Sequence, residues 1–278
     1  MDATNIGQNF TVLSIHVLYR GCGIPIAWKI VKGTEKGSWK PHWIKLFQLL
    51  KDTVPKDWQV IVSADRGLYA PWLFQEICAL NWHPFLRINH QGTYQISGEQ
   101  QWRGLDSVVP KVGRNFSGSV ICFKSNPLNC TLLARWDEGY QEPWLIVTDL
   151  QPREANVLWY GLRSWIEASY RDLKSDGWQW HKTRLREPER AERLWLAMAV
   201  ATLWTVTMGS DEPGKTSQIA SVQGNEQDEI QSTSLKKNPC HLSVFLRGLI
   251  NIIADLLCGK AITLQGLFPQ SSSIFNTS

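Results

Sequence analysis

One short run of residues, 58–64, constrains the fold more than any other part of the chain. It reads Trp-Gln-Val-Ile-Val-Ser-Ala and is followed at once by Asp65-Arg66-Gly67. A brief apolar, β-branched run of this kind is typical of a central strand that is buried on both faces. Such a strand needs a layer on each side, which favours a sheet covered by helices. Asp65 is then expected at the end of a central strand.

The surrounding segments supply the rest of an α/β fold. A turn at Gly21-Cys22-Gly23 separates two β-rich stretches, which predicts a β-hairpin. If the first few residues form a strand ending at Asp2, the order is strand, strand, strand, helix, strand, helix, and a mixed sheet flanked by helices is expected. The hairpin is predicted at residues 10–19 and 24–31, and the two helices at residues 41–50 and 71–81.

Beyond residue 84 the pattern changes to short strand-like stretches separated by Gly, Asn and Pro, which predicts an all-β insertion. Helices are expected again at residues 154–175, 188–208 and 241–257, the second of them buried. We therefore expect an α/β catalytic core at 1–84 and 143–208, a β-rich insertion at 85–142, a flexible linker at 209–238 and a C-terminal helical segment at 239–278.

Composition excludes several classes of protein. With 43% hydrophobic residues, 19% charged residues and a net charge of +4, the chain is expected to be soluble and globular. Its longest uncharged run, residues 194–209, is shorter than the roughly 20 residues that span a bilayer. The six cysteines form no Cys-x2-Cys pair, which disfavours a zinc site. No secretion signal is evident, so a cytoplasmic location is expected.

The densest group of chemically active side chains is Tyr160, Arg163, Glu167 and Lys174. On an ideal α-helix these four side chains share a stripe about 60° wide. From geometry alone, a solvated helix face with an Arg163–Glu167 pair is the more common explanation. The alternative is an acidic metal ligand beside groups that grip phosphate.

The spacing Tyr-x2-Arg-x3-Glu-x6-Lys resembles the signature of the DDE transposases of bacterial insertion sequences, in the group called insertion sequence four. Asp65, in Ala-Asp-Arg-Gly-Leu-Tyr, resembles the second aspartate of that family. Asp2 resembles the first, at the end of the first strand. The resemblance covers Asp2 to about Met208, and the family is similar in carrying a β-rich insertion between the second aspartate and the glutamate.

The resemblance implies a ribonuclease-H-like core that cleaves DNA strands and transfers them at insertion-sequence ends. Asp2, Asp65 and Glu167 would be the catalytic residues and would bind two Mg²⁺ or Mn²⁺ ions. Tyr160, Arg163 and Lys174 would contact phosphates near the cleaved end. The implied partners are double-stranded DNA and a second copy in a synaptic homodimer, in the bacterial cytoplasm at the nucleoid and without a membrane.

Three further assignments have alternatives. Arg66 is expected either to bind DNA or to pair with a carboxylate, with equal weight. Asp149 is expected to form a turn before Gln151-Pro152 in preference to serving as a fourth acidic group. Trp178 and Trp180 are expected to pack in the protein in preference to stacking on an unpaired base.

The start of the chain raises a rival hypothesis. The resembled family has a helical DNA-binding region and most of the first strand before its first aspartate, whereas only Met1 precedes Asp2 here. Because metal ligands need tight placement, we expect a poorly positioned Asp2 and weak or absent activity. The alternative function is thus a truncated or repurposed transposase remnant that binds DNA without catalysis.

Overall fold

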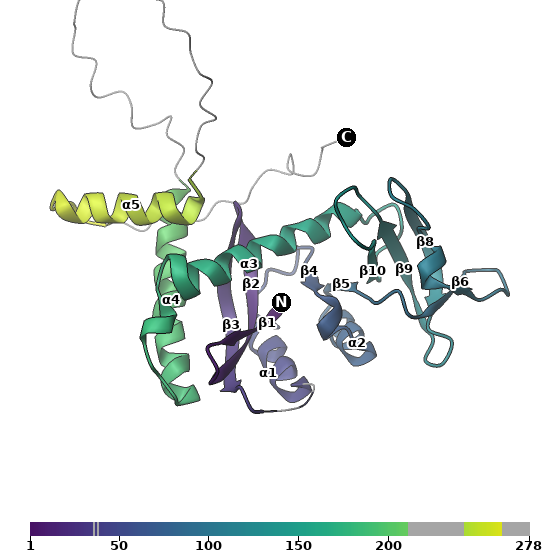
Figure 1. The fold of residues 1–278 in the computed structure, drawn as a ribbon, viewed down its shortest axis with the longest axis horizontal. Helices are drawn as coiled ribbons and strands as arrows, with labels where there is room; N and C mark the ends of the chain where they lie inside the picture. The colour runs from purple at the N-terminus through teal and green to yellow at the C-terminus, as the bar shows by residue number, and fades with distance from the viewer. Residues whose placement is uncertain (36, 38, 211–241, 263–278) are drawn as a thin grey trace, which may run out of the picture.

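The computed structural model describes residues 1–35, 37, 39–210 and 242–262 (Figure 1). Their structure is mixed α/β, with strands in two hydrogen-bonded sheets and helices on either side. Most of the predicted linker at 209–238 lies outside the described residues, as do parts of the predicted C-terminal segment at 239–278.

The first sheet contains the predicted hairpin. β1 (Asp2–Ile6) pairs antiparallel with β2 (Phe10–Tyr19), which pairs antiparallel with β3 (Cys22–Lys32). The β-branched and aromatic residues of β2 and β3 suit a pleated surface that is buried on both faces. The hairpin prediction is confirmed.

The second sheet has seven strands and is mixed. β4 and β5 are parallel, and every other pair is antiparallel. The order across the sheet is β4 (Ile61–Ala64), β5 (His83–Arg87), β10 (Trp144–Thr148), β9 (Leu128–Arg135), β8 (Asn115–Cys122), β6 (Thr93–Ile96) and β7 (Arg103–Gly104). The strands of the expected insertion thus extend the sheet beyond β10, and its expected first residue, 85, lies within β5. The division into domains stays a prediction.

β4 is shorter than predicted and stands at one edge of its sheet. The predicted strand covered residues 58–64, but only Ile61–Ala64 are paired, and Trp58 is 58% exposed. The edge of β4 that does not pair with β5 faces β1, because the Met1 nitrogen donates a hydrogen bond of 2.8 Å to the Ser63 carbonyl oxygen. This contact places the start of β1 beside the end of β4.

Helices cover both faces of the strands (Figure 1). α1 (Lys40–Leu50) and α2 (Pro71–Ala79) share one core cluster with Leu13, Ile15, Val62 and Leu86. α3 (Ser164–Arg171) and α4 (Pro188–Gly209) share another with Val12 and Ile30. Because successive strand residues point to opposite faces, the alternation along β2 feeds both clusters.

The predicted helix at 154–175 is three helical segments in succession. A 3₁₀ helix spans Val157–Arg163, α3 follows, and a π-helical turn spans Asp172–Asp176. Asn156 caps the first segment by accepting a 2.9 Å hydrogen bond from the Leu158 nitrogen. The prediction of one α-helix is therefore wrong in detail, since the α form occupies only its middle.

α4 and α5 (Val244–Leu257) cross at very close range. A β-carbon added at Gly248 would lie 1.7 Å from the Thr205 carbonyl oxygen, and one added at Gly209 would lie 1.9 Å from the Val244 carbonyl oxygen. Because the neighbouring atoms are backbone, they cannot rotate away. The two glycines allow the close approach of the helices.

Among the described helices, none combines the length and the apolar character required to cross a bilayer.

Gly248→Ala should separate the two helices and lower the free energy of unfolding by about 1–3 kcal/mol, because an extra methyl group overfills the contact. Urea denaturation followed by circular dichroism measures this change. The control is Gly67→Ala, where an added β-carbon has no atom within 4 Å. Equal stability of the Gly248 variant and the wild type would contradict the close packing.

Candidate active site

Asp65 follows β4 directly, as the sequence predicted. Its carboxylate accepts a 2.8 Å hydrogen bond from the Arg66 backbone nitrogen and so caps the 3₁₀ turn Arg66–Leu68. The Tyr160 hydroxyl donates a second hydrogen bond of 3.1 Å to the same carboxylate oxygen. The side chain of Asp65 is 38% exposed, so it remains open to a ligand.

Asp2 begins β1, whereas the sequence was interpreted as a strand that ends there. The pairing of Asp2 with Ser14 on β2 sets its position in the sheet. Its carboxylate accepts a hydrogen bond from the Ala3 nitrogen at 2.9 Å, and its carbonyl oxygen accepts one from the Tyr170 hydroxyl at 3.3 Å. Its side chain is 15% exposed. Several contacts thus hold Asp2, which differs from the expected loose placement.

The Arg163 guanidinium joins the three candidate carboxylates. Its Nη1 donates to Glu167 at 2.8 Å, and its Nη2 lies 3.1 Å from Asp2 and 3.8 Å from Asp65. The side chain of Arg163 is only 10% exposed, whereas that of Glu167 is 64% exposed. The Arg163–Glu167 pair that the sequence suggested does form. Arg163 is nevertheless a buried centre of charge rather than part of a solvated face.

The pKa values in this cluster follow from these contacts. Burial acts to raise the pKa of Asp65, but the Arg66 N–H, the Arg163 charge and the Tyr160 hydroxyl outweigh it, and the pKa lies below its ordinary value. Burial acts to lower the pKa of Arg163, but Asp2 and the other acidic neighbours raise it above normal. Both groups are therefore charged near neutral pH.

Lys174 lies beside β1. Its Nζ donates a 2.7 Å hydrogen bond to Thr4 Oγ1 and lies 5.6 Å from the centre of the Tyr170 ring. Burial lowers its pKa, and the Asp2 charge opposes that shift in part. Tyr160, Arg163 and Lys174 thus contact residues of β1 or the end of β4, whereas Glu167 contacts Arg163. The four residues lie on 3₁₀, α and π segments, and not on the ideal α-helix that was assumed.

A second cluster on the far side of Asp65 was not foreseen. Glu142 accepts a 3.0 Å hydrogen bond from Arg87 and a short one from Arg66, and Arg87 Nη1 lies 3.9 Å from Asp65. Of the two alternatives for Arg66, pairing with a carboxylate is therefore present. Arg87 and Glu142 carry no local sequence signal, because the pairing of β5 with β10 is what brings them to Asp65.

Asp149 lies apart from the carboxylates. It pairs with His83 at 3.0 Å. In the β4–β5 ladder His83 is opposite Ile61, whereas Leu86 is opposite Ala64, which precedes Asp65. Asp149 is therefore at the other end of β4, and it does not serve as a fourth acidic group at the site.

The chemistry of the three carboxylates suits a hard divalent cation, because Mg²⁺ and Mn²⁺ prefer oxygen ligands. In the described part of the chain, however, no group of three or more His, Cys, Asp or Glu side chains is arranged to hold a metal ion. Asp2, Asp65 and Glu167 each face Arg163 and not one another. The three carboxylates are the type of ligand that these ions prefer, but they could bind an ion only if the Arg163 side chain moved away from them.

Arg163→Gln should lower the free energy of unfolding near neutral pH by about 1–3 kcal/mol, because Asp2 and Asp65 lose their counter-ion. Partial exposure of Asp65 and Glu167 keeps the loss below that of a fully buried pair. Asp65 has a lowered pKa in the folded state, so its stabilising contribution is present above about pH 4 and is lost as the pH falls through that folded pKa.

Urea denaturation over this pH range measures the effect. The difference in free energy of unfolding between wild type and variant should become smaller in acid. A difference that does not depend on pH would contradict the assignment. Arg171→Gln, a change at an exposed arginine at the end of α3, is the matched control.

Comparison with curated proteins found no match. A family model described as the transposase DDE domain matches residues 3–204. The matched residues include Asp65, Glu167 and the whole Tyr160–Lys174 group, and they begin directly after Asp2. Members of this family bind DNA and generally use divalent metal ions. Because the match covers well over half of its residues, the chain belongs to the transposase DDE domain family.

Proposed function

We propose that this chain is a transposase of the insertion sequence four type, which cleaves DNA at insertion-sequence ends and transfers the freed strand to target DNA. The observation that carries the proposal is the convergence of Asp2, Asp65 and Glu167 on one guanidinium from β1, from the end of β4 and from α3. It would act on chromosomal DNA in the bacterial cytoplasm, at the nucleoid and without a membrane.

The strand arrangement supports a ribonuclease-H-like core. β3, β2 and β1 lie in that order, and the Met1–Ser63 hydrogen bond places β1 next to β4, which is parallel to β5. Together these strands would form the central sheet of such a core. In such a sheet, Asp2 and Asp65 would lie at neighbouring strands, β1 and β4, and Glu167 would lie on α3, which packs over them.

Asp2, Asp65 and Glu167 are the residues that would hold two Mg²⁺ or Mn²⁺ ions. When bound, such ions activate the attacking oxygen and stabilise the leaving oxygen in a displacement at phosphorus. Arg163 would release the carboxylates when the ions neutralise them, and its guanidinium would then be available for a phosphate oxygen. Tyr160 and Lys174 would also contact phosphate oxygens of the DNA. Arg66 would reach the DNA if it left its ion pair with Glu142.

Glu167→Gln should reduce cleavage of supercoiled plasmid in Mg²⁺ or Mn²⁺ by more than about a hundredfold, because the amide is a weak metal ligand. The conversion of supercoiled to nicked and linear DNA on a gel measures this. Isothermal titration with Mn²⁺ provides a second readout, in which the variant should bind the ion more weakly.

The matched control is Glu189→Gln, an exposed glutamate in the first turn of α4, which should cut and bind Mn²⁺ as the wild type does. Equal cleavage by the Glu167 variant and the wild type would reject the assignment. DNA binding without cleavage by the wild-type chain would instead favour the alternative, a remnant that binds DNA without catalysis.

We also propose that the enzyme works as a homodimer. α4 was expected to be buried, but its outer face exposes large apolar side chains, and α5, which crosses it closely, exposes more. The exposed apolar residues are Leu196, Val200 and Trp204 on α4 and Leu246, Ile250, Ile253, Leu256 and Leu257 on α5. No described residue covers this α4–α5 face. A second copy would bury it, as apolar patches of this kind commonly mark protein interfaces.

Ile250→Asp together with Ile253→Asp should shift the chain from dimer to monomer, because two carboxylates would be buried in the interface. Sedimentation velocity measures the change. Leu49→Asp, a change at an exposed leucine of α1, should leave the dimer intact. If the wild-type chain stays monomeric at all accessible concentrations, both without DNA and with DNA, the dimer is contradicted.

A further inference from the structure

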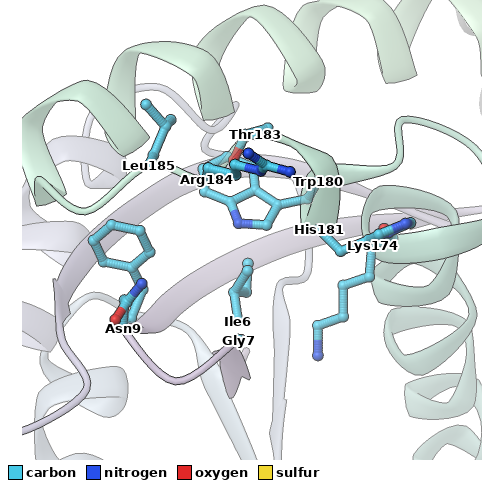
Figure 2. Close-up of a pocket in the computed structure, with 10 residues that line it drawn as sticks. Ile6, Gly7, Asn9, Lys174, Trp180, His181, Thr183, Arg184 and Leu185 are labelled. Carbon is cyan, nitrogen blue, oxygen red and sulfur yellow. The ribbon is translucent and has the colours of Figure 1, made fainter.

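A cavity of about 210 Å³ lies between the β1–β2 turn and the segment that leads from the π turn to α4 (Figure 2). Trp180 and Phe10 are part of its lining, but they are only 4% and 2% exposed. The Trp180 ring packs edge-on against Phe10 at 6.4 Å and Trp195 at 5.7 Å, and Trp178 packs against Phe245 at 5.6 Å. The expectation that Trp178 and Trp180 pack in the protein is thus confirmed, and Trp180 has almost no surface left for a ligand.

The carboxylate of Glu142, in contrast, is surrounded by basic side chains next to the candidate site. It accepts a 3.0 Å hydrogen bond from Arg87 and a short one from Arg66, and His90 Nδ1 lies 3.6 Å from its other oxygen. Arg87 comes from the end of β5, Arg66 from the turn after β4 and His90 from the loop after β5. One carboxylate that is 32% exposed is therefore shared by several cationic groups.

Strand register places Arg87 beside Asp65. Ala64 on β4 is opposite Leu86 on β5, so the next residues, Asp65 and Arg87, are neighbours where these two parallel strands end. Arg87 Nη1 lies 3.9 Å from Asp65 Oδ1, whereas its Nη2 lies 3.0 Å from Glu142 Oε1. The guanidinium is thus bonded to Glu142 and stands just short of a hydrogen bond to Asp65.

Without Glu142, Arg87 would turn to Asp65. The Arg87 side chain is only 18% exposed, and a largely buried cation that loses its partner is costly, so it pairs with the next carboxylate within reach. Arg66 is 45% exposed and can turn to water instead. Asp65 already faces Arg163 at 3.8 Å. A second guanidinium against Asp65 would repel any metal cation that approaches this carboxylate.

We infer that Glu142 is a positioning residue, which holds Arg87 away from Asp65 and so keeps that carboxylate open to the divalent ion. This inference rests on the proposed function. Glu142 acts through Arg87 and does not itself bind the ion. Side chains one contact away from a metal ligand commonly set the affinity of the site, and their loss typically weakens metal binding about ten- to a hundredfold.

Isothermal titration of the full chain with Mn²⁺ alone tests the inference. Glu142→Gln should weaken Mn²⁺ binding about tenfold or more, because a neutral amide no longer holds Arg87. Glu142→Asp, which keeps the charge, should bind Mn²⁺ more tightly than Glu142→Gln. Circular dichroism checks that both variants are folded, as expected for a partly exposed residue that lies outside the strands.

A double-mutant cycle separates the effect of Arg87 from the mere loss of a negative charge. Arg87→Gln should change Mn²⁺ affinity little when Glu142 is present, because the arginine is already paired. In the Glu142→Gln background the same change should restore most of the lost affinity, because the competing guanidinium is gone. The matched control is Glu138→Gln, a change at an exposed glutamate in the loop before β10, which should bind Mn²⁺ as the wild type does.

Wild-type Mn²⁺ affinity in Glu142→Gln would overturn the inference, as would an equal effect of Arg87→Gln in both backgrounds. If the wild type binds Mn²⁺ and cuts plasmid while either of these results is found, only this inference fails. If the wild type neither binds Mn²⁺ nor cuts plasmid, the proposed function fails as well.

Discussion

The candidate site depends on one guanidinium. Asp2, Asp65 and Glu167 carry like charges, which repel one another. Arg163, almost wholly buried, offsets that repulsion by contacting all three. The same contacts hold the helical segment across the join between β1 and β4.

Buried hydrogen bonds keep α3 in the position that this arrangement needs. Tyr170 bonds to Ser14 at 2.6 Å, and Ser169 accepts a hydrogen bond from the Gly23 nitrogen at 2.5 Å, so the helix is fastened to both strands of the hairpin. His16 packs edge-on against Tyr170, and burial lowers the pKa of His16 to about 3. The histidine is therefore neutral near physiological pH and adds no charge beneath the carboxylates.

Much of the fold could be predicted from local pattern. The hairpin, α1, α2, α4 and most of the strands between residues 83 and 148 follow from periodicity and turn residues, because these signals act over a few neighbouring positions. The errors arose where residues that are distant in the chain but close in space determine the local structure. β4 lost its first three residues, which lie outside the β4–β5 ladder although the Val60 carbonyl oxygen accepts a hydrogen bond from the His83 nitrogen, and the helix at 154–175 changed form along its length.

At the site, the resemblance to the transposase family pointed to Asp2, Asp65, Tyr160, Arg163, Glu167 and Lys174 as a chemical group, because a motif is a property of the linear chain. The geometry of these residues, in contrast, is a property of the folded chain. That Arg163 lies among the carboxylates, that Glu142 holds Arg66 and Arg87 beside Asp65, and that Trp180 lines a cavity next to Lys174 all depend on strand pairing and helix packing. These contacts join residues up to 161 positions apart (163 minus 2), and no local signal specifies such long-range neighbours.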